Sequence, residues 1–202
     1  MIRRGESWGE TSPIPDEAVW AADDPAAAAV VAEALREGRP IPPVALTGGD
    51  LARTLGGRGD EAAMRTGHAT HVTVDVGSAL IDGRLHWFVA HLVARRSWLR
   101  GRVVVIANAA FLGAWNIAPR AHPGDGRLDL LDGDLPLGER LRARRRLAAG
   151  THVPHPAIAC RRTAAVQLDL DRPTPIYLDG RRTGSATTLS VRVEPAALDV
   201  WV

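Results

Sequence analysis

The residues best placed to do chemistry lie in the segment NAAFLGAWNIAPRAHPGDGRLDL, from Asn108 to Leu130. Asp125 precedes Gly126 there, so its carboxylate stands where the chain turns tightly and backbone carbonyls can converge. Magnesium prefers oxygen ligands and keeps several waters. The spacing alone favours an ordinary Asp-Gly turn, and a metal site at Asp125 with its neighbours Arg127 and Leu128 is the alternative.

Two histidine pairs with tight spacing raise a second possibility, a zinc site. The pairs are His68 with His71 and His152 with His155. Neither pair encloses a glutamate as in zinc peptidases, and His71 falls on the polar face of a predicted strand. We therefore interpret these histidines as ordinary surface or core residues rather than as zinc ligands.

The composition removes several classes of function. All 25 basic residues are arginine, so a Walker-A lysine and Schiff-base chemistry are excluded, whereas arginine remains for binding phosphate. The single cysteine, Cys160, excludes an internal disulfide framework. A net charge of +2 does not indicate nucleic acid as a partner.

The elements that must position these residues are mostly strands. Alternating or buried apolar runs predict them, and Asp-Gly pairs or prolines separate them. The predicted strands cover residues 72–76, 85–92, 101–107, 127–131, 163–170, 175–178, 187–194 and 198–202. This pattern predicts an α+β fold that is mostly β, a two-layer antiparallel β-sandwich-like domain with a few helices.

Two helices are also predicted. The first starts at Asp24 as N-cap and ends before Gly38. The second covers residues 136–149, with Leu137, Leu141 and Ala148 inward and its arginines mostly outward. Those arginines form either a solvated face or a surface that attracts anionic lipid headgroups.

Three stretches together resemble the diacylglycerol kinase and sphingosine kinase family of lipid kinases. The first is the long segment, with Asn108, Gly113, Ala118-Pro119-Arg120-Ala121 and Asp125-Gly126-Arg127-Leu128-Asp129. The second is Thr47-Gly48-Gly49-Asp50-Leu51-Ala52-Arg53-Thr54-Leu55-Gly56, which follows a short predicted strand. The third is Asp179-Gly180-Arg181, where the family carries Asp-Gly-Glu.

The resemblance implies Mg²⁺ and ATP as cofactors and a lipid hydroxyl as the phosphate acceptor. It places the nucleotide at Thr47, Gly48, Gly49, Asp50 and Asn108, a magnesium ion at Asp125, and the general base at Asp179. The chain departs from the family in four places. Leu46 and Gly49 stand where the family carries a glycine and an asparagine, and Arg181 replaces a glutamate. No Gly-Gly-Asp-Gly-Thr phosphate cradle occurs in residues 1–41, and a helix pair near residues 95–100 is missing.

We therefore expect an arm, helix and remnant of an α/β nucleotide-binding domain in residues 1–65, and the lipid kinase-like β domain in residues 66–202. One hypothesis is a lipid kinase-like enzyme. The other is a non-catalytic relative that binds a lipid or a protein partner. In a further form of this hypothesis, the chain is one subunit of a split kinase, completed by a separate nucleotide-domain protein, or it forms a homo-oligomer. No run of residues matches a signal sequence or membrane span, so we expect a cytoplasmic protein. If it binds lipid, we expect it to associate with the membrane surface.

Overall fold

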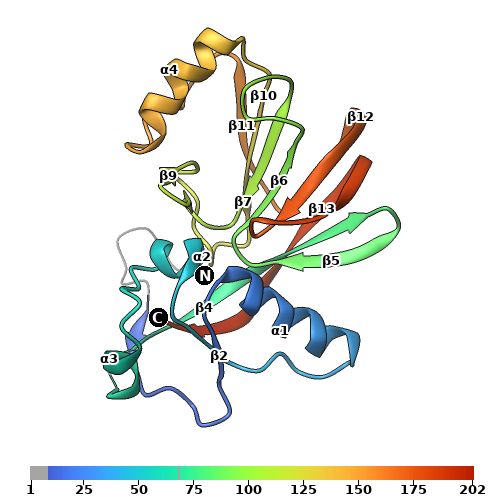
Figure 1. Cartoon of the computed structure of the whole chain (residues 1–202). Helices are drawn as coiled ribbons and strands as arrows, with labels where there is room; N and C mark the ends of the chain where they lie inside the picture. Colours follow the sequence, from blue (N-terminus) through green and yellow to red (C-terminus); the bar gives the residue numbers. More distant parts are fainter. Residues whose placement is uncertain (1–8, 68) are drawn as a thin grey trace.

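The computed structural model describes residues 9–67 and 69–202, so His68 of the first histidine pair lies outside the described residues. Most of the chain forms one large sheet in the order β1-β4-β13-β12-β6-β7-β10-β11, with β5 beside β4 (Figure 1). The pairs along this order are antiparallel. The strands are β1 Glu10–Thr11, β4 Thr70–Ile81, β5 Arg84–Phe88, β6 His91–Arg95, β7 Val103–Ala107, β10 Leu128–Gly133, β11 Ile158–Thr163, β12 Ala165–Leu178 and β13 Arg181–Trp201.

The sheet folds back on itself around a shared core. Apolar side chains from β4, β5, β12 and β13 pack with those from β6, β7 and β10 in one cluster. Gly77 of β4 lets Phe88 of β5 lie directly against the backbone, since a Cβ at Gly77 would come within 2.1 Å of the Phe88 ring. The arrangement confirms the predicted antiparallel, sandwich-like fold class.

Two of the predicted Asp-Gly turns are present, but the strand end predicted at Asp132-Gly133 is wrong, because these two residues lie inside β10 and pair with Ala159 and Ile158. Asp82 and Gly83 have φ values of 49° and 76°, and they join β4 to β5. Asp179 and Gly180 have φ values of 47° and 81°, and they join β12 to β13. Two successive residues with positive φ favour Asp-Gly and match the twist of an antiparallel hairpin.

Several strand boundaries differ from the prediction. The predicted strand 85–92 is wrong, because the backbone turns away at residues 89–90 between β5 and β6. The breaks predicted at residues 171–173 and at Pro195 are register shifts inside the long strands β12 and β13. A bulge lets a strand continue past residues that cannot pair. Strand β11, Ile158–Thr163, was not predicted.

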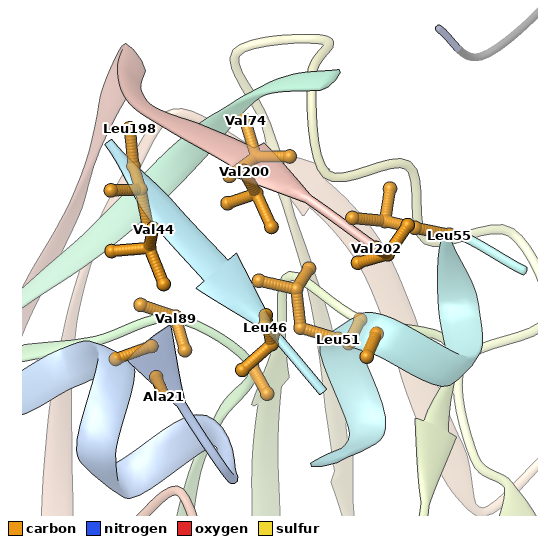
Figure 2. Close-up of a cluster of buried hydrophobic side chains, with 14 of the residues drawn as sticks. Ala21, Val44, Leu46, Leu51, Leu55, Val74, Val89, Leu198, Val200 and Val202 are labelled. Atoms are coloured by element: carbon orange, nitrogen blue, oxygen red, sulfur yellow. The ribbon is translucent and has the colours of Figure 1, made fainter. Parts of the chain in front are cut away.

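A small parallel unit precedes the sandwich. It consists of β2 Val19–Ala21, α1 Asp24–Arg36, β3 Val44–Leu46 and α2 Gly49–Thr54. Strand β3 pairs in parallel with β2 on one side and with the end of β13 on the other. Figure 2 shows Leu46 of β3 and Leu51 of α2 in the core that this unit shares with β4 and β13. A short helix, α3 Glu61–Arg65, follows this unit and precedes β4. Elsewhere, the long loop after β7 contains a small hairpin of β8 Phe111–Leu112 and β9 Trp115–Asn116.

Helix α4, Leu137–Leu147, stands off the sheet at the end of the sandwich (Figure 1). The prediction that Leu137, Leu141 and Ala148 point inward is wrong, since the two leucines are 55% and 46% exposed and Ala148 is exposed as well. Arg140 is the buried residue of the helix. Its guanidinium bonds to the carbonyls of Leu135, Trp98 and Gly101, so this contact attaches the helix to the neighbouring loops. Among the described residues, no helix is long and apolar enough to cross a bilayer.

Candidate functional site

A buried carboxylate occupies the start of α2, at the edge where β2 and β3 both end. The helix α1 is capped by Asp23, whose Oδ1 accepts a bond of 2.9 Å from the Ala26 N–H, so the predicted cap at Asp24 is wrong. Asp24 accepts bonds from the N–H groups of Asp50 (2.6 Å) and Leu51 (3.1 Å) instead. The carboxyl group thus caps a helix 26 residues further along the chain.

This contact bears directly on the predicted nucleotide residues. Gly48 is the N-cap of α2, and Gly49 has φ 99° and lies so close to Asp24 that a Cβ would come within 2.4 Å of its Oδ1. Thr47 bonds to the carbonyl of Ala21 (3.4 Å). The N–H groups of Asp50 and Leu51, which could face a phosphate at the start of α2, already serve an acidic group, so these two donors do not fit an ATP phosphate in this arrangement. The nucleotide roles of Thr47, Gly48, Gly49 and Asp50 stay predictions.

The predicted general base, Asp179, lies deep in the same region. Its Oδ2 accepts a bond from the Val89 N–H, and its Oδ1 accepts bonds from the Ala90 and His91 N–H groups, all at 2.9 Å. These three bonds hold the corner between β5 and β6 against the β12–β13 turn. Burial raises the pKa of Asp179 to about 6, although the three bonds act in the opposite direction.

Asp24, Asp50 and His91 complete a cluster of titratable groups around Asp179. Burial, and after it the negative charge of Asp179, together raise the pKa of Asp24 to about 7. Burial also raises the pKa of Asp50 and lowers that of His91 to about 4. The sequence prediction included Asp50 and Asp179 but missed Asp24 and His91.

His91 is neutral at physiological pH because of this low pKa. Its Nε2 lies 3.1 Å from the carbonyl oxygen of Ala109, which can only accept, so Nε2 carries the proton. Its Nδ1 therefore offers a lone pair, 3.8 Å from Oδ2 of Asp50. The cluster can hold and exchange protons, and it carries no formal positive charge.

Asn108 is fully buried and joins elements of the fold. Its Nδ2 donates to the carbonyls of Asp75 (2.8 Å) and Val89 (2.9 Å). The carboxylate of Asp75 in turn accepts the N–H groups of Gly126 (2.7 Å) and Ala196 (2.8 Å). The segment Asn108–Leu130, which we call the signature segment, is therefore anchored to β4 and to the bulge of β13. The nucleotide role predicted for Asn108 stays a prediction.

The predicted metal residues lie at the start of β10. Asp125 Oδ1 accepts the Arg127 N–H (3.1 Å), and its Oδ2 pairs with the guanidinium of Arg162 on β11. The side chain of Leu128 is buried, and that of Arg127 is exposed. Within residues 9–67 and 69–202, no group of three histidine, cysteine or acidic side chains could hold a metal ion. The magnesium site at Asp125 thus stays a prediction, with one carboxylate that is already paired.

An apolar cavity of about 120 Å³ separates α4 from the sheet. Trp98 and Trp115 form one wall, with their rings edge to face and their centroids 5.2 Å apart. Leu99 and Leu141 lie at its exposed border. Much of the remainder is formed by aliphatic side chains of β7, β10, β11, α4 and the neighbouring loops: Val103, Val105, Ile117, Leu131, Leu135, Leu147 and Ile158. Sequence reasoning missed this cavity because it placed the leucines of α4 against the sheet.

These features define a class of protein: a β-sandwich-like domain joined to a short parallel α/β unit, with an apolar cavity between the sheet and α4. The family model of the YegS C-terminal NAD kinase beta sandwich-like domain matches residues 63–202, and the chain belongs to this family. The predicted resemblance to lipid kinases is confirmed. The boundary predicted between residues 65 and 66 stays a prediction.

The fold is also similar to solved structures of proteins assigned as diacylglycerol kinases of Bacillus anthracis str. Sterne. One has a TM-score of 0.60 and 13% identity, over 79% of this chain and 69% of that protein. Another has a TM-score of 0.55 and 16% identity, over 79% and 66% of the two chains. At these identities the likeness concerns the fold. A comparison with curated proteins found no match.

Proposed function

We propose that this chain is a lipid-binding member of the lipid kinase-like family and that it holds a hydrocarbon chain in the cavity beneath α4. The observation that carries the proposal is the cavity itself, lined mainly by two tryptophans and aliphatic side chains, with His152, Arg140 and Arg144 as its polar members. Transfer of each methylene group from water into such a cavity contributes about 0.8 kcal/mol. An apolar chain is therefore the ligand chemistry that this cavity favours.

The start of α2 supports a binding function over phosphoryl transfer by this chain alone. Phosphoryl transfer depends on positioning the phosphates and stabilising their charge. Asp24 occupies the N–H groups that would do so, and the nearby Asp50 and Asp179 add further acidic groups. A nucleotide bound here would meet negative charge, and it would find the N–H groups of Asp50 and Leu51 already occupied. In this proposal, a complete kinase would require a separate protein that supplies the nucleotide site.

Phosphorylation of a lipid hydroxyl by this chain is the second candidate function. The observation in its favour is the pKa of about 6 at Asp179, close to the value that suits a general base at neutral pH. Both oxygens of Asp179 already accept backbone N–H groups, however, so the carboxylate would have to accept a hydroxyl proton in addition.

Calorimetric titration with 1-octanol and 1-decanol tests lipid-chain binding. We expect binding of both, with 1-decanol about 15-fold tighter because it adds two methylene groups. Ala143→Phe, which places a ring in the cavity, should lower the affinity at least tenfold. Ala148→Phe, on an exposed position of the same helix end, is the matched control and should bind like the wild type. Equal affinities in all three proteins would refute the cavity as the site.

A second titration, with magnesium-ATP, separates the two candidates. We expect no heat of binding at millimolar nucleotide and no transfer of labelled phosphate to a mixed lipid extract. Transfer that is lost in Asp179→Asn would instead establish the kinase reaction and would refute a binding-only role.

A further inference from the structure

Three exposed leucines gather at the end of the sandwich. Leu99 lies in the connection between β6 and β7 and is 49% exposed, whereas Leu137 and Leu141 lie one turn apart on α4 and are 55% and 46% exposed. Arg140 holds the two segments together through the carbonyls of Trp98 and Gly101. We call Leu99, Leu137 and Leu141 the leucine tip. Leu99 and Leu141 also border the apolar cavity.

Arginines flank the leucine tip. Arg96 and Arg100 stand on either side of Leu99 in the chain, and neither forms an ion pair within the described residues. Both line a second, polar cavity of about 510 Å³. On α4, Arg144 and Arg145 are exposed beside the leucines, and the Arg144 guanidinium lies 5.8 Å from the Trp115 ring centroid.

The acidic groups near the tip pair with other arginines: Asp132 with Arg102, Asp134 with Arg140, and Glu139 with Arg142. Among the described residues, Arg96, Arg100, Arg144 and Arg145 have no such ion pair and keep their positive charge at the surface. Asp171 lines the polar cavity together with Arg172. A second copy of the same surface would therefore be repelled by its like charge, and a purely polar acidic partner would leave the leucines in water.

An anionic bilayer satisfies both features at once. Leucines that project from a surface can enter the boundary between headgroups and acyl chains, while arginines at the same level bind lipid phosphates. We propose that the leucine tip, with Arg96 and Arg100, docks the protein on an anionic membrane. This inference deepens the proposed function and rests on it in one respect: docking brings the mouth of the cavity to the surface from which a lipid chain enters.

The magnitudes make the proposal measurable. A leucine that is half exposed before docking and buried afterwards contributes about tenfold in affinity, and each arginine near the headgroups contributes about fivefold. Leu137→Ser should weaken binding about tenfold, and it changes a side chain outside the cavity lining. Arg96→Gln with Arg100→Gln should weaken binding about 25-fold.

Vesicle sedimentation at about 0.15 M salt tests the proposal with phosphatidylcholine vesicles that contain, or lack, about a third phosphatidylserine. We expect binding to the anionic vesicles only. The matched controls are Leu80→Ser and Leu85→Ser, which alter leucines that are 45% and 52% exposed on the β4–β5 hairpin, and Arg181→Gln with Arg182→Gln on the β12–β13 turn. These controls should bind like the wild type. Absence of binding, or equal losses in tip and control variants, would overturn the proposal.

Titration of Leu137→Ser with 1-decanol, without vesicles, keeps the two proposals apart. Unchanged alcohol binding together with weakened vesicle binding supports docking through the tip. If the wild-type protein binds the alcohol but not the vesicles, the docking proposal is overturned and the cavity proposal is supported. Vesicle binding without alcohol binding refutes the cavity proposal and keeps the docking surface.

Discussion

Asp24→Asn is expected to change how the stability of this protein depends on pH. In the folded protein the pKa of Asp24 is raised from 3.8 to about 7, chiefly by burial. The folded state therefore holds a proton at pH values where the unfolded carboxyl group is already ionised. Because the folded state binds more protons, the free energy of unfolding falls as the pH rises from about 4 to about 7.

The size of this effect follows from the two pKa values. A difference of about 3 pH units corresponds to about 4 kcal/mol once the pH exceeds 7. This is a large part of the roughly 5 to 15 kcal/mol that stabilises a typical domain. The substituted asparagine would be uncharged at every pH, and its side-chain oxygen can still accept one N–H of α2. The variant should match the wild type within about 1 kcal/mol at pH 5 and exceed it by up to about 4 kcal/mol at pH 8.

Urea unfolding of both proteins at pH 5, 6, 7 and 8, followed by circular dichroism, measures this difference. Asp129 and Asp179 also have pKa values raised to about 6, so the wild type and the variant share part of the slope. Only the difference between the two proteins reports on Asp24. A difference that stays constant from pH 5 to pH 8 would show that the Asp24 carboxyl group is not buried beside Asp179, and would refute the reasoning.

Two further predictions concern the signature segment. Asn108→Ala should lower the free energy of unfolding by about 2 to 4 kcal/mol, since the carbonyls of Asp75 and Val89 lose a buried donor; Asn108→Asp, which keeps the volume, should not restore the loss. At Asp125, magnesium should raise the melting temperature more in Arg162→Gln than in the wild type, because Arg162 competes for the carboxylate. No response in either protein, or an equal one in Asp125→Ala, would remove the metal site.

The α4 helix shows where sequence reasoning succeeded and where it failed. Its position and approximate length follow from local patterns, because a polar, arginine-rich run that is followed by Gly150 predicts a helix and its end. Which face is buried depends on what lies opposite. The loop carbonyls at Trp98 and Gly101 bind the guanidinium of Arg140, so an arginine is buried and two leucines face outward.

The carboxylate cluster shows the same distinction. The resemblance to lipid kinases selected Asp50 and Asp179, which do lie in one region. Their partners were not predictable, because Asp24 and Asp50 are 26 residues apart and His91 and Asp179 are 88 residues apart. Asp24 also fitted a local role as a helix cap, and Asp23 takes that role instead.

By itself, the sequence determined the fold class, the two Asp-Gly hairpins, the absence of lysine chemistry and the family. These depend on local periodicity, turn residues and composition, which act over a few residues. Tertiary structure alone decided that a carboxylate occupies the start of α2, that Asn108 joins β4 to the β5–β6 corner, and that a cavity opens beneath α4. These features arise from contacts between segments far apart in the chain, where burial and hydrogen bonding set both the pKa values and the exposed surface.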